Sequence, residues 1–143
     1  SAAPTCSTST TVSSSIENFR IRPNNSTSLV YSAIILYHNG STVSNTSSSG
    51  NNNIGGYGTP GASTTSNTFG SVEIYLPNYA GSTNKVLSVT SIGENNSATT
   101  SFIGAITAGL FSDTTAISSL TLTATSNDFA SGSRFDLYGI KNS

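Results

Sequence analysis

The side chains of this chain that could do acid–base chemistry are few and widely spaced. His38 is the single histidine, and it directly precedes an Asn39-Gly40 pair. A hydrolytic triad needs a base of this kind, but a position beside a turn favours a polar residue at the end of a strand. The six carboxylates are equally dispersed: Glu17, Glu73, Glu94, Asp113, Asp128 and Asp136.

No spacing among these carboxylates favours a catalytic pair, although a glycosidase pair can in principle come from different strands. Glu73 and Asp136 fall on the outer alternating set of their segments, which predicts solvated side chains. Asn127-Asp128 lacks the dense acidic pattern of a calcium loop, and the lone Cys6 can build neither a disulfide nor a cysteine-based zinc site. We therefore expect no catalytic residue, no cofactor and no metal ion.

Three tyrosines are the best candidates for a surface contact: Tyr57, Tyr75 and Tyr79, each in or beside a predicted loop. An aromatic ring can stack on the apolar face of a sugar while its hydroxyl forms hydrogen bonds. The same side chains can pack against a neighbouring subunit, and this second interpretation is favoured.

Composition excludes several classes of partner. Charged residues make up 8% of the 143 residues and the net charge is −1, whereas roughly 25% is usual. The five basic residues are scattered, so no nucleic-acid footprint is present. The longest apolar run, 29–37, has the length of a strand and falls short of the ~20 residues that span a bilayer, so we expect no membrane insertion. The start at Ser1, without a signal segment, suggests a processed product or part of a longer chain.

The pattern of short strands separated by turn-forming residues predicts one all-β domain, an antiparallel β-sandwich of jelly-roll type. Residues 1–15 are polar and of low complexity, typical of an arm or linker, and 16–143 form the sandwich. Turn-forming residues fill 46–68, which predicts a long loop, and Asn39-Gly40 predicts a type I′ hairpin turn. Alternating or apolar runs bounded by such residues predict strands at 16–22, 29–38, 41–45, 69–76, 85–92, 100–111, 117–124 and 134–140.

Two of these runs are apolar on both alternating sets. Val30, Ile34 and Leu36 alternate with Tyr31, Ala33 and Ile35 in the first. In the second, 102–111, one set holds Ile106 and Leu110 and the other Ile103 and Phe111. A sandwich strand normally buries one face and presents the other to water, so we expect a second covering layer. A homo-oligomer supplies it, with three copies as the expected number.

The second half of the chain contains three long motifs: FGSVEIYLPNYAGSTNK at 69–85, ENNSATTSFIGAITAGLFSDTTAISSLTLT at 94–123 and FASGSRFDLYGIKNS at 129–143. They resemble a domain of virion-associated proteins from tailed phages, particularly marine and cyanobacterial ones. The resemblance covers roughly 69–143; the segment from 16 to 40 is similar only in outline, and 1–15 are not matched.

What the resemblance implies is a structural place on the exterior surface of a virion, as a head decoration or cement protein or a tail-fibre domain. Other virion proteins are then the expected partners, and no catalytic residue is carried over. The expected number of three copies depends on analogy with phage fibres and decoration proteins. The alternative is an attachment domain that binds host-surface glycans, for which Tyr57, Tyr75 and Tyr79 are the candidate contacts.

Overall fold

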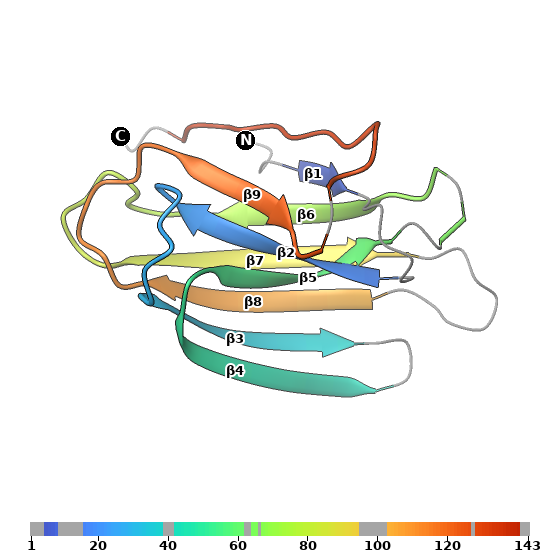
Figure 1. The fold of residues 1–143 in the computed structure, drawn as a ribbon, viewed down its shortest axis with the longest axis horizontal. Coiled ribbons are helices and arrows are strands. Elements are labelled where there is room, and N and C mark those ends of the chain that lie inside the picture. The colour runs from blue at the N-terminus through green and yellow to red at the C-terminus, as the bar shows by residue number, and fades with distance from the viewer. Residues whose placement is uncertain are drawn as a thin grey trace.

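The computed structural model describes residues 5–8, 16–38, 42–61, 64–65, 67–94, 103–126 and 128–140, and within them it is an antiparallel β-sandwich (Figure 1). A six-stranded sheet has the order β1-β6-β7-β8-β3-β4, and a three-stranded sheet has the order β5-β2-β9. The strands are β1 Thr5–Thr8, β2 Ile16–Pro23, β3 Tyr31–His38, β4 Val43–Asn51, β5 Ile54–Pro60, β6 Gly70–Tyr75, β7 Lys85–Gly93, β8 Ile103–Phe111 and β9 Leu120–Ala124.

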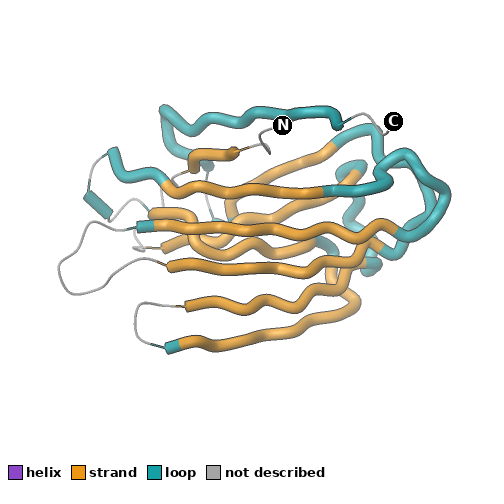
Figure 2. The backbone as a smooth tube through the Cα atoms, turned by 180° about the vertical axis from the view of Figure 1, so that it is seen from behind, coloured by secondary structure: helices purple, strands orange, loops and turns teal. Residues whose placement is uncertain are grey.

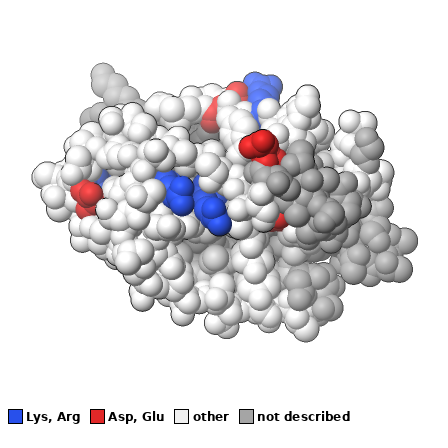
Figure 3. All heavy atoms as spheres, in the orientation of Figure 1, with Lys and Arg blue, Asp and Glu red and all other residues white. Residues whose placement is uncertain are grey.

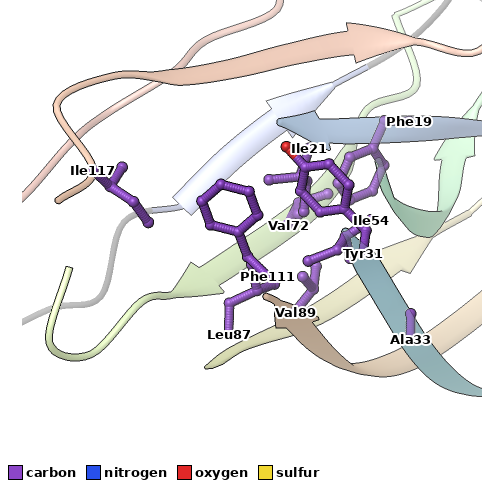
Figure 4. Packing of buried hydrophobic residues seen from close by; sticks show 10 residues of the cluster. All are labelled: Phe19, Ile21, Tyr31, Ala33, Ile54, Val72, Leu87, Val89, Phe111 and Ile117. Carbon is purple, nitrogen blue, oxygen red and sulfur yellow. The ribbon is translucent and has the colours of Figure 1, made fainter. Parts of the chain in front are cut away.

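The predicted all-β sandwich is confirmed, and alternation explains how it closes. In β2, Phe19 and Ile21 are buried while Arg20 and Arg22 turn outward. In β7, Leu87 and Val89 point inward with less than a twentieth of their surface exposed. The inward residues of both sheets meet in one core, drawn in Figure 4 as Phe19, Ile21, Tyr31, Ala33, Ile54, Val72, Leu87, Val89, Phe111 and Ile117.

Aromatic packing fixes one end of this core. The rings of Tyr31 and Phe111 stack with centroids 5.0 Å apart. The Tyr31 hydroxyl donates to the carbonyl of Ser26 at 3.0 Å, which satisfies its polar end inside the sandwich. Burial raises the pKa of Tyr31 above its usual range, so this ring stays neutral.

Two of the sequence predictions are wrong. Residues 46–68 are not one long loop, because β4 continues to Asn51 and β5 occupies Ile54–Pro60. The segment 134–140 belongs to neither sheet, although its apolar and polar residues alternate. Segment 5–8 of the predicted arm forms β1, which pairs antiparallel with the edge of β6. Strands β3 and β4 form the predicted hairpin, with His38 opposite Val43; the turn predicted at Asn39-Gly40 lies outside the described residues.

A left-handed turn instead connects β2 to β3. Asn24 and Asn25 both have φ of 51°, and the Ser26 amide donates to the Pro23 carbonyl at 3.0 Å, as in a type I′ turn. Asparagine tolerates positive φ better than other residues with a Cβ. The Asn24 amide group also holds the β8–β9 connection, since Nδ2 donates to the Ala116 carbonyl at 3.0 Å and Oδ1 accepts from the Ser118 amide at 2.9 Å.

Replacing Asn24 with glycine should destabilise the fold by about 1 kcal/mol, because exposed hydrogen bonds of this kind contribute roughly that much together. Glycine keeps the positive φ, so only the side-chain contacts are lost. Asn25→Gly is the matched control, since it makes the same change at the same backbone conformation, and its free energy of unfolding should stay within about 0.5 kcal/mol of the parent. Urea titrations of both variants measure this. Equal losses would show that the Asn24 amide does not anchor the connection.

Candidate interaction surface

The outer face of the six-stranded sheet, the side turned away from β5, β2 and β9, is the candidate site. Antiparallel pairing places residues that are opposite one another on the same face. Across β7, β8, β3 and β4, one row runs through Ser88, Ala108, Ile34 and Ser47. The outward residues are Ser71, Glu73 and Tyr75 of β6; Val86, Ser88, Thr90 and Ile92 of β7; Gly104, Ile106, Ala108 and Leu110 of β8; Ser32, Ile34, Leu36 and His38 of β3; and Val43, Asn45, Ser47 and Ser49 of β4.

Large apolar side chains on this outer face remain exposed to solvent. The exposed fractions are 57% for Ile34, 53% for Leu36 and 59% for Ile106, which lie on the neighbouring central strands β3 and β8. Val86 and Ile92 of β7 are 56% and 51% exposed. Seen from behind in Figure 2, the strands of this sheet lie nearest the viewer, and no segment that the structure describes lies over its outer face.

Charge is nearly absent from the same surface. Glu73, on β6 at one side of the sheet, is the outward carboxylate among the five strands β6, β7, β8, β3 and β4, and none of their outward residues is Lys or Arg. The opposite side of the molecule, drawn in Figure 3, is also mostly uncharged, but there the arginines of β2 reach the surface. Exposed apolar side chains on neighbouring strands, with few charges beside them, are typical of a surface that binds another molecule.

A shallow hollow of about 500 Å³ opens on this surface. It is bounded by outward residues of the three strands β8, β3 and β4 and by the backbone between them. Its lining is Ser32, Ala33, Ile34, Ser47, Ser48, Ser49, Ala108, Gly109 and Leu110. Small residues in β4 and at Ala108 make the depression, while Ile34 and Leu110 form its walls. The hollow is therefore a place where a side chain from another molecule can enter.

The three candidate tyrosines do not form one surface. Tyr57 lies on β5 and stacks on Tyr37 with ring centroids 4.7 Å apart, and its backbone carbonyl accepts a hydrogen bond from the Ser91 hydroxyl. Tyr75 ends β6 on the outer face and is 51% exposed. Tyr79 lies in the β6–β7 connection and is 52% exposed. The loop position expected for Tyr57 is corrected by the pairing of β5 with β2, which places this residue in a sheet.

His38, Glu73 and Asp136 lie at separate places in the part of the chain that the structure describes. His38 ends β3 opposite Gly104 and Val43. Glu73 is exposed, and Asp136 forms a 2.9 Å ion pair with the mostly exposed Arg134. Among the residues that the structure describes, no three His, Cys, Asp or Glu side chains group together, and no helix is long and apolar enough to cross a membrane.

Lys85 is a buried cation that sequence analysis treated as one of several scattered charges. Only 1% of its surface is exposed. Its Nζ donates to the carbonyls of Thr115 at 2.7 Å and Asp113 at 3.2 Å, so it ties β7 to the loop after β8. The Thr115 amide donates to Asp113 Oδ1 at 2.7 Å, and this hydrogen bond holds the pKa of that carboxyl below its usual range. These contacts shape the loop that borders the core.

Comparison with known protein families, with curated proteins and with solved structures gives no match for this chain.

Sequence analysis identified part of this surface. The two-sided apolar patterns of 29–37 and 102–111 predicted that each of these strands has a second apolar face, and the register places Ile34, Leu36 and Ile106 of those faces on one side of the sheet. It missed Val86 and Ile92, which flank the inward Leu87 and Val89 of β7. The signal was available, because the second alternating set of β7 also contains β-branched apolar residues.

Proposed function

We propose that this chain is a non-enzymatic structural component of the exterior of a tailed-phage particle, either a capsid decoration or cement protein or a domain of a tail fibre. The uncovered, nearly uncharged outer face of the six-stranded sheet carries the proposal, because such a surface serves association with protein better than contact with water. The resemblance of residues 69–143 to virion-associated phage proteins supports the location.

A binding and assembly role also agrees with the side chains that stabilise the fold. Lys85 and Asn24 use their polar groups on backbone carbonyls and amides of the same chain. Arg134 and Asp136 form a local ion pair. These polar side chains thus stabilise loops of the same chain. The exposed apolar side chains of the outer face are left to contact partners such as other virion proteins.

Quantitative mass spectrometry of purified particles tests this function. We expect the chain at many copies per particle, in fixed proportion to the major capsid or fibre protein. Preparations should be banded on a density gradient, so that co-purifying host protein serves as the internal control. Absence of this chain from intact particles would overturn the proposal.

Host-surface glycan binding is the second candidate, and the exposure of Tyr75 and Tyr79 favours it. Both residues lie at the β6–β7 end of the sandwich, and each presents about half of its surface. A glycan array separates the two functions. Retention that is lost in a Tyr79→Ala variant would support attachment, whereas a purely structural component should show no retention.

A further inference from the structure

We infer that the outer face of the six-stranded sheet binds a second copy of this chain, face to face, about a two-fold axis that runs along β8. This inference deepens the proposed assembly role and rests on it for its biological meaning. It concerns the isolated domain, so it can be tested without a particle.

The area of the outer face suits such an interface. Five strands spaced about 4.8 Å apart and about eight residues long, with a rise of about 3.3 Å per residue, cover roughly 600 Å². Two copies would together bury roughly 1,200 Å², the lower end of the range for specific, stable interfaces. A small peptide would leave most of the exposed apolar side chains uncovered.

Strand order makes the outer face self-complementary. Strand β8 is central among β6, β7, β8, β3 and β4. A two-fold axis along β8 therefore places β7 of one copy over β3 of the other, and β6 over β4, while each row of paired residues keeps its level. Packed sheets lie about 10 Å apart and interdigitate their side chains.

Beside the axis, several large side chains of one copy meet small side chains of the other. Val86 of one copy faces Ser32 of the other, and Ser88 faces Ile34, because each pair shares a row of the sheet. Tyr75 faces Ser47 in the row of Ser88. Val86 and Tyr75 therefore point at the hollow beside Ser32 and Ser47, which supplies the space that they need.

Charges also permit this pairing. Glu73 shares its row with Thr90, Ile106, Leu36 and Asn45. The two-fold axis brings Glu73 over Asn45 of the second copy, so no two carboxylates meet. A different protein would need its own apolar face with a complementary shape. A second copy of this chain already has such a face.

Two copies, instead of the three expected by analogy, follow from this symmetry. One self-complementary face makes an isologous contact, which closes when two chains have joined. A three-fold assembly would require each chain to present two different contact surfaces.

Light scattering of the isolated 143-residue chain and its variants tests the inference. At about 100 µM, well above a micromolar dissociation constant, we expect the parent to show twice the 14.6 kDa chain mass. Ile106→Lys should show the mass of one chain, because two lysines would meet at the axis. Leu137→Lys is the matched control: Leu137 is 87% exposed and belongs to neither sheet, so this variant should stay dimeric. A monomeric parent, or a dimer unaffected by Ile106→Lys, would overturn the inference.

A charge exchange tests the orientation of the two copies. Ile34→Asp and Ser88→Lys should each give monomers, and the double variant should recover the dimer, because the two new charges face each other across the axis. Thermal melts of all variants check that each one folds. If the folded double variant stays monomeric, the two-fold arrangement is wrong. A dimeric domain that is absent from particles would contradict the proposed function and leave the interface standing.

Discussion

Replacing Gly56 with alanine should destabilise the domain by about 3 kcal/mol, the upper range for overpacking a core. Gly56 of β5 lies opposite Phe19 of β2, and the Phe19 ring covers the glycine. A Cβ built on Gly56 would overlap three carbons of that ring. Phe19 is 3% exposed and packed in the core, so the ring has no space to move away.

The neighbouring glycine provides the control for this prediction. Gly55 belongs to the same strand, and a Cβ added there would contact no atom within 4 Å. Gly55→Ala should therefore not destabilise the domain, and it should stabilise the fold by about 0.5–1 kcal/mol, because alanine loses less backbone freedom on folding than glycine does. Calorimetry should show a melting temperature lower by about 10 °C for Gly56→Ala alone. Equal melting temperatures would contradict the packing of β5 on β2.

Lys85→Met should cost about 2 kcal/mol. Methionine nearly keeps the volume of the aliphatic stem but removes both hydrogen bonds to the carbonyls of Asp113 and Thr115. Hydrogen bonds from a charged donor contribute about 1.5–3 kcal/mol. Burying the ammonium opposes this contribution, since desolvation of a buried charge can exceed what it gains.

The sign of the Lys85→Met effect decides between these two forces. We expect loss of stability, because the backbone carbonyls remain in place and lose their donor. Asn84→Ala, a change at the exposed residue just before β7, should leave the urea midpoint unchanged. A Lys85→Met variant as stable as the parent would mean that the two hydrogen bonds do no more than offset the desolvation of Lys85.

Period-two alternation was the most informative sequence signal. Phe19 and Ile21 occupy one alternating set of the strand predicted at 16–22, and both are buried; in β8, Ile103 and Phe111 are buried while Ile106 of the other set is exposed. Alternation depends only on the pleat of a strand, so it holds before any tertiary contact is known. The predicted sandwich and part of its outer face follow from it.

Strands β4 and β5 were missed for different physical reasons. β4 lies at the edge of its sheet and most of its side chains face water, so Ser, Thr and Asn can fill it without an apolar pattern. In β5, the sequence GGYG is typical of a turn, but Gly56 makes room for Phe19 and Gly58 adopts a φ of 91° beside Ile103. These glycines are needed because of contacts with distant parts of the chain, which the local propensity of a sequence does not predict.

For 134–140 the error was the opposite one, because a strand was predicted and none formed. Its alternation predicted a strand, but a strand also needs a partner for its backbone groups, and this segment joins neither sheet. Leu137, Tyr138 and Ile140 consequently remain exposed. An alternating pattern thus predicts which side chains share a side, while strand pairing depends on where the rest of the chain leaves an open edge.

Cryo-electron microscopy of the particle that contains this chain tests the proposed function most directly. We expect many copies of the sandwich on the outside of the head or tail, with the outer faces of their six-stranded sheets covered by protein. Density in which Ile34, Leu36 and Ile106 face open solvent would contradict the assembly role of that face, and a particle without the domain would contradict the proposed function as a whole.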